Sequence, residues 1–172
     1  DEFPVQLWPA LGEIGASGIF VPEEYGGVGL GHVERAIFIE EISRYSAGLG
    51  LALMTHHMAL EAILVFGSEE QKQKYLPGLS SGEKIGGFSV TEPGGGSDFA
   101  GQVSSAEKID GGWILNGRKC FITNAGIADV NVILARTGED EKGRGILSAF
   151  IVEKGAEGLK PGRHENKLGL RG

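Results

Sequence analysis

The sequence has little of several features that would mark a specialised class of protein. One cysteine, Cys120, stands among 172 residues, so no disulfide can form within the chain and a reducing compartment is expected. Lys and Arg number 16 against 23 Asp and Glu, giving a net charge of −7, which argues against a nucleic-acid-binding surface. The apolar runs are short and the chain opens with Asp1 and Glu2. We therefore expect neither a membrane span nor a signal peptide.

The first half of the sequence is predicted to be helical. Apolar residues recur at helical spacing within 7–19, and the segment 21–31, with one proline and four glycines, interrupts that spacing. Helical spacing resumes over 32–42 and again over 49–66. Next, Ser68 is placed to cap a short helix that begins with acidic residues and that Pro77 is expected to end.

The second half changes to short strands joined by tight turns. Asp110, Gly111 and Gly112 form a typical hairpin turn. With no helical segment between the strands, an antiparallel sheet or partial barrel is expected. The predicted strands cover residues 85–91, 102–109, 113–116, 119–123, 130–136 and 147–152.

The predicted fold class is therefore α+β, a helical bundle domain (1–84) followed by a mostly antiparallel, β-barrel-like domain (85–172). A sheet that stops at KLGLRG would leave an open edge, which globular domains normally cover. We expect further chain after it.

The segment Phe88–Asp98, FSVTEPGGGSD, is the most informative motif. Three consecutive glycines expose the backbone, so successive amide groups can converge on an anion while Thr91 adds a hydroxyl. The spacing is not that of a dinucleotide-binding or P-loop motif, and strands rather than a long helix follow. A phosphate cradle of a cofactor and a plain glycine-rich turn both remain open.

A second polar segment, RKCFITNAG at 118–126, is predicted to begin as a strand. Phe121 and Thr123 would then share one face, presenting an aromatic surface and a hydroxyl suited to a flat heterocycle. An ordinary amphipathic strand with Phe121 in the core is the alternative.

Both segments, in this order, resemble the acyl-CoA dehydrogenase family. The resemblance extends from LGEIGASGIFVPEEYGGVGLG through FGSEEQKQKYLPGLSSGEKIGGFSVTEPGGGSD and LNGRKCFITNAGIADVNVILART to KLGLRG. It implies that the helical half is the family's N-terminal domain and that the strands begin the β-domain covering one side of an FAD.

The resemblance also implies roles for individual residues. Phe88, Val90 and Thr91 would line the isoalloxazine, while Gly96 and Ser97 would meet the FAD pyrophosphate, Ser97 also touching acyl-CoA. Phe121 stands where the family commonly has tryptophan, so the apolar face is kept and an N–H donor is lost. Thr123 matches the residue near the reactive N5, and the pocket-floor candidates on the helix are Met54, Thr55 and Met58.

No catalytic base is assigned. The family's catalytic glutamate belongs to a C-terminal helical domain, beyond Gly172. Glu92 is expected to order its turn, and the acids on helices and loops are expected to be solvated. His56 and His57 are adjacent on a helix and point about 100° apart, so no metal site is expected.

The expected function is α,β-dehydrogenation of acyl-CoA with FAD, electrons passing to an electron-transferring flavoprotein. A homodimer or homotetramer is implied, in the cytoplasm or, in a eukaryote, the mitochondrial matrix. A flavin-dependent oxidase or monooxygenase on the same scaffold is one alternative. A non-catalytic ligand-binding module is the other, if the gene ends near Gly172.

Overall fold

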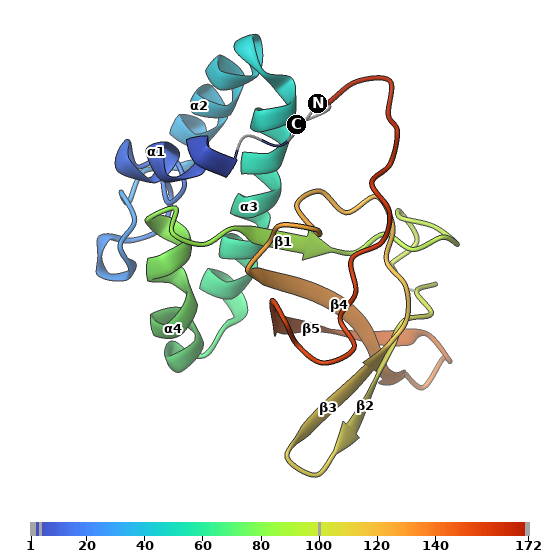
Figure 1. The fold of residues 1–172 in the computed structure, drawn as a ribbon. Helices are drawn as coiled ribbons and strands as arrows, with labels where there is room; N and C mark the ends of the chain where they lie inside the picture. Colours follow the sequence, from blue (N-terminus) through green and yellow to red (C-terminus); the bar gives the residue numbers. More distant parts are fainter. Residues whose placement is uncertain (1–2, 4, 100, 171–172) are drawn as a thin grey trace.

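A computed structural model of the chain describes residues 3, 5–99 and 101–170. Within them, helices come first and a five-stranded sheet follows, which confirms the α+β class. Figure 1 shows the helices gathered on one side of the sheet, with the hairpin β2–β3 projecting away from them. The helical elements are η1 (Val5–Leu7), α1 (Trp8–Glu13), η2 (Glu23–Tyr25), α2 (His32–Tyr45), α3 (Ala47–Phe66) and α4 (Glu69–Ser80).

Helix α4 begins as predicted and continues past the residue expected to end it. The Ser68 side chain accepts from the Gln71 amide while the Gln71 side chain accepts from the Ser68 amide, a reciprocal cap that satisfies two free N–H groups. Pro77 lies inside the helix, so the predicted stop was wrong. Leu76 and Leu79 on either side of it are fully buried, and their burial outweighs the one hydrogen bond that proline cannot donate.

The sheet differs from the predicted one. Its strands are β1 (Gly86–Ser89), β2 (Ser105–Ile109), β3 (Gly112–Asn116), β4 (Val130–Glu139) and β5 (Gly145–Glu153). β2–β3 and β4–β5 are antiparallel, but β1 and β2 both pair parallel with β4. The sheet is mixed and is not a closed barrel, so the mostly antiparallel, barrel-like prediction was wrong. The chain between β1 and β4 is long enough for the crossover that a parallel pair requires.

The predicted strand at 119–123 does not form. Residues 117–120 are irregular and 121–127 form bends and turns. Phe121 has a φ of 55° and Asn124 a φ of 66°, left-handed values that end any extended run. Phe121 and Thr123 therefore do not share a strand face, and the alternation argument fails.

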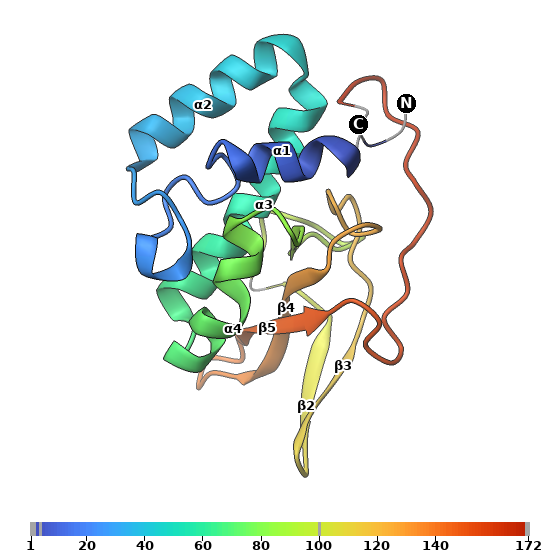
Figure 2. The same cartoon turned by 60° about the vertical axis from the view of Figure 1, so that its left-hand side comes forward.

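Helix α3 is the centre of the helical half and also contacts the sheet. It packs against α2, α4 and β1, and its Leu53 and Leu60 side chains are fully buried. By length and composition alone it could cross a membrane, contrary to the expectation of short apolar runs. Half of that apolar window is buried inside the molecule, as in the core helix of a globular domain. Figure 2 shows α3 lying behind α1, between α2 and the sheet.

The helices and the sheet are joined by a close contact between α3 and β1. The Gly86 amide donates to His56 Nδ1 at 2.8 Å. A Cβ at Gly86 would lie 3.0 Å from the Ala59 Cβ, so glycine lets the strand approach the helix this closely. The motif that follows β1 therefore starts from a fixed point.

Candidate functional site

The motif Phe88–Asp98 leaves the sheet at the end of β1 and returns on itself. Glu92 and Gly95 exchange two backbone hydrogen bonds, of 3.1 Å and 3.0 Å, which close a tight turn. The turn residues Gly94 and Gly95 are exposed, and so is Ser97. The glycines thus sit at the tip of a loop, where their backbone is accessible.

The Glu92 carboxylate is buried at the base of this loop. Its two oxygens accept hydrogen bonds from the amides of Val103 (2.7 Å) and Ser104 (3.0 Å). Burial on its own would raise the pKa of this carboxyl, but the bonds from Lys119, Ser104 and Val103 outweigh it and lower the pKa to about 2. Glu92 is an ionised anchor whose two oxygens are both taken by donors within the protein, which confirms the expectation that it orders the turn.

Lys119 reaches the same place from the second polar segment. Its ammonium lies 2.8 Å from Glu92 Oε1, 2.8 Å from Gln102 Oε1 and 3.0 Å from the Val90 carbonyl oxygen. The lysine side chain is only 10% exposed. The two motifs chosen from the sequence are therefore joined by a buried ion pair.

A backbone hydrogen bond adds to this junction. The Cys120 amide donates to the Thr91 carbonyl at 2.9 Å, so Thr91 and Phe121 lie on neighbouring stretches of chain. Phe121 is 74% exposed, which excludes the alternative that it is a core residue. A bulky side chain held exposed on a left-handed backbone is costly and typical of a binding site.

Asn124 fixes the end of the second segment. Its side-chain amide donates to the carbonyls of Ala52 (2.9 Å) and Gly86 (3.0 Å), on α3 and β1 respectively. Thr123, directly before it, is half-buried. The segment is therefore held against the helical half as well as against the first motif.

The three residues predicted on α3 differ in their exposure to solvent. Met54 and Met58 are 37% and 38% exposed and lie one turn apart, whereas Thr55 is 6% exposed. The Thr55 hydroxyl donates to the Leu51 carbonyl at 3.1 Å, so it has an internal partner. Met54 lines a shallow groove between α2 and α3.

Phe88, Gly96 and Ser97 complete the predicted set. Phe88 is half-buried and packs against the core formed by helices and sheet. Gly96 lies beside Thr91, because a Cβ there would be 3.3 Å from the Thr91 hydroxyl oxygen. Among the described residues, the amides of Gly96 and Ser97 donate no hydrogen bond to another group, as a site that binds an anion through backbone N–H groups requires.

The histidine pair is structural. His57 Nε2 lies 2.9 Å from the Ala16 carbonyl oxygen, and His56 accepts from Gly86. Burial, with a smaller contribution from His57, lowers the pKa of His56 to about 3; burial lowers that of His57 to about 4. Within the part of the chain that the structure describes, no group of three or more metal-binding side chains comes together.

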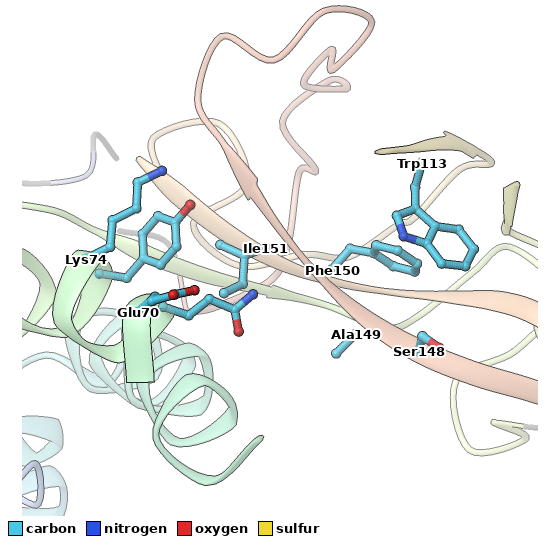
Figure 3. Close-up of a pocket in the computed structure, with 9 residues that line it drawn as sticks. Glu70, Lys74, Trp113, Ser148, Ala149, Phe150 and Ile151 are labelled. Atoms are coloured by element: carbon cyan, nitrogen blue, oxygen red, sulfur yellow. The ribbon is translucent and has the colours of Figure 1, made fainter. Parts of the chain in front are cut away.

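Another surface groove lies away from both motifs. It runs between α4 and β5, where Trp113 and Phe150 meet edge to face at 5.4 Å between ring centroids. Figure 3 shows Lys74 and Glu70 of α4 at one end of it and Trp113 at the other. None of the residues chosen from the two motifs lines this groove.

Sequence reasoning missed three of the residues that build the site. Lys119, Gln102 and Asn124 turn inward, and nothing in the pattern of apolar residues indicates this. The one available signal was a lysine beside a polar and glycine-rich segment in a chain with an excess of acidic residues.

Comparison with known proteins identifies the family to which the chain is similar. Residues 1–83 match the family description "Acyl-CoA dehydrogenase, N-terminal domain", and residues 87–172 match "Acyl-CoA dehydrogenase, middle domain". An acyl-CoA dehydrogenase of Bacillus subtilis is 49% identical over 173 residues, which cover 100% of this chain and 45% of that protein. The chain therefore spans less than half the length of this relative.

Two solved structures are also similar. An acyl-CoA dehydrogenase from Bacillus anthracis, complexed with FAD, has a TM-score of 0.87 and 41% identity, with coverage of 96% of this chain and 28% of that one. A structure from a study of the electron transferring flavoprotein of Acidaminococcus fermentans has a TM-score of 0.88 and 40% identity. The matched region covers 96% of this chain and 43% of the chain in that structure.

Proposed function

Because this chain belongs to the acyl-CoA dehydrogenase family, we propose that it is part of an FAD-dependent enzyme that dehydrogenates the α,β-bond of acyl-CoA thioesters. The observation that carries the proposal is the junction of the two motifs. Residues 90–92 and 119–120 are far apart in sequence yet share a backbone hydrogen bond and a buried ion pair. The two segments that the resemblance places at the flavin thus form one surface.

Each motif residue takes a role that its position permits. Val90, Thr91 and Thr123 contact the isoalloxazine, and the exposed Phe121 ring supplies an apolar surface next to it. Gly96 and Ser97 hold the pyrophosphate through amides that donate to no other group among the described residues. Phe88 packs behind the ring, because it is partly buried against the core.

In the proposed reaction, this part of the protein binds the FAD and the acyl-CoA and orients them relative to each other. When bound, FAD accepts the hydride that leaves the β-carbon of the thioester. Met54 and Met58 present flexible apolar side chains to the acyl chain, and Ser97 contacts the CoA portion. Thr55 is removed from this set because it is buried and bonded to Leu51. The carboxylate that removes the α-proton is not Glu92, which is paired with Lys119.

The larger assembly is also part of the proposal. Similarity to the structure from the electron transferring flavoprotein study supports such a flavoprotein as the electron acceptor. We further propose a homodimer or homotetramer, a domain boundary near residue 84, and a location in the cytoplasm or, in a eukaryote, the mitochondrial matrix.

The test uses the full-length protein that contains this chain. It should purify with bound flavin, and anaerobic addition of an acyl-CoA should bleach the flavin absorbance. Electrons should then pass to an electron-transferring flavoprotein. Stoichiometric hydrogen peroxide in air without that acceptor would indicate an oxidase instead, and a protein that binds no flavin would contradict the proposal.

A further inference from the structure

We propose that Lys119, paired with Glu92, is a positioning residue for the flavin: it fixes the two motifs at the separation the isoalloxazine needs. This inference rests on the proposed function, because it assigns a task to a side chain beside that site. It concerns the bonds within the protein that hold the flavin-contacting residues in place.

All three ammonium hydrogens of Lys119 have an acceptor. The acceptors are Glu92 Oε1 (2.8 Å), Gln102 Oε1 (2.8 Å) and the Val90 carbonyl oxygen (3.0 Å). A lysine has three N–H donors and no acceptor, so the side chain is fully bonded within the protein. Because it is 10% exposed, little competing water can reach it and its position is fixed.

One of these bonds acts directly on the proposed ring contacts. The Val90 carbonyl belongs to the same peptide group as the Thr91 amide, so the ammonium polarises the group between the two residues. A hydrogen bond to a carbonyl strengthens the donor at the other end of that peptide. Lys119 therefore sets both the place and the donor strength of the Val90–Thr91 peptide.

Glu92 extends the same control to the glycine-rich loop. Its backbone closes the turn at Gly95, and its carboxylate accepts from the amides of Val103 and Ser104. Glu92 thus holds the chain both where the glycine-rich turn begins and closes, at residues 92–95, and farther on at Val103 and Ser104. An apolar pair of equal size would fill the space but could not hold these backbone groups, since it has no oxygen to accept from the two amides and no N–H to donate to the Val90 carbonyl.

A second ion pair in the chain offers a matched control. Lys74 and Glu153 approach at 2.7 Å, as close as the buried pair, but their side chains are 63% and 53% exposed. They join α4 to β5, away from both motifs. A substitution that removes the Lys74 charge shows what the loss of an ion pair does when the proposed flavin site is left unchanged.

The experiment compares Lys119→Met with Lys74→Met in the full-length protein. FAD affinity is measured by quenching of flavin fluorescence, and the bound flavin by its visible absorption and circular dichroism. Lys119→Met should weaken FAD binding about tenfold or more, the effect of losing hydrogen bonds to a charged group, and should alter both spectra. Lys74→Met should leave affinity and spectra unchanged. A Lys119→Met protein with the affinity and spectra of Lys74→Met would overturn the inference, as would weaker binding with unaltered spectra, which a merely structural role would give.

Lys119→Met leaves Glu92 buried without its partner, so it could fail to fold. The double variant Glu92→Gln/Lys119→Gln removes both charges and keeps polar side chains in place. It should still bind FAD more weakly with altered spectra, because a glutamine amide cannot serve three acceptors. Wild-type affinity and spectra in this variant would refute the inference while the proposed function stands. A wild-type protein that binds no FAD would refute the proposed function itself.

Discussion

The imidazole Nδ1 of His56 accepts a hydrogen bond from the Gly86 amide at 2.8 Å, and this bond joins the central helix to the first strand of the sheet. The accepting nitrogen must carry no proton, so the bond exists only while the ring is neutral. Asn124 then bonds to the carbonyls of Gly86 and Ala52. The same strand end thus anchors both motifs.

The first prediction concerns pH. His56 and His57 have pKa values of about 3 and about 4, below the ordinary 6.5. Between these lowered pKa values and pH 6.5, the unfolded chain binds protons that the folded chain does not. The free energy of unfolding must therefore fall as the pH drops below about 6.5. Glu92, with its pKa lowered to about 2, adds a further loss below about pH 4.5. Urea unfolding midpoints measured from neutral pH downward should decrease, with up to about two protons taken up on unfolding from the histidines.

The control for this prediction is the exposed His164, whose replacement by glutamine should leave the pH dependence intact. His57→Gln should reduce it. An unfolding midpoint that stays constant across that pH range would show that the buried pair does not control acid stability.

The second prediction concerns the contact between helix and strand. Gly86→Ala should destabilise the protein by about 1–3 kcal/mol, as overpacking typically does, because its Cβ would meet Ala59 and the His56 ring. Gly112→Ala is the matched control, since nothing lies within 4 Å of a Cβ there. Denaturant unfolding measures both. Equal effects of the two substitutions would show that α3 and β1 are not closely packed.

A third prediction separates the two roles of Asn124, its side-chain hydrogen bonds and its left-handed backbone conformation. Asn124→Gly keeps the left-handed backbone and loses the bonds to Ala52 and Gly86, whereas Asn124→Ala also adds strain at a φ of 66°. Both should lower the unfolding free energy, by about 1–3 kcal/mol for the unpaired buried carbonyls, with alanine the worse. The exposed Asn116→Ala serves as control. Alanine no worse than glycine would mean that the left-handed conformation is not populated.

The fourth prediction concerns Phe121, which is exposed in the described structure. Phe121→Ala should change the unfolding free energy of the flavin-free protein by less than about 0.5 kcal/mol, as for most surface substitutions. It should nevertheless weaken FAD binding, while Phe121→Trp should retain it. If alanine destabilised the flavin-free protein by the amount typical of a core residue, the aromatic ring would be packed inside instead.

The sequence allowed the local features to be predicted and left the long-range ones open. Ser68 forms the predicted cap, and Asp110–Gly112 the predicted hairpin turn, because each depends on residues a few positions apart. The parallel pairing of β1 with β4 depends on where a long connection runs, so turn signals could not reveal it. Lys119 looks like any surface lysine in the sequence, and only the fold brings Glu92, Gln102 and the Val90 carbonyl to it.

The most direct test of the account is a structure of the full-length protein with FAD bound. The isoalloxazine should contact Val90, Thr91 and Thr123, with Phe121 beside it and the pyrophosphate at the amides of Gly96 and Ser97. Lys119 should keep its three protein acceptors and make no contact with the flavin. A flavin bound in another place, such as the groove between α4 and β5 in Figure 3, would contradict the assignment of the two motifs to the cofactor.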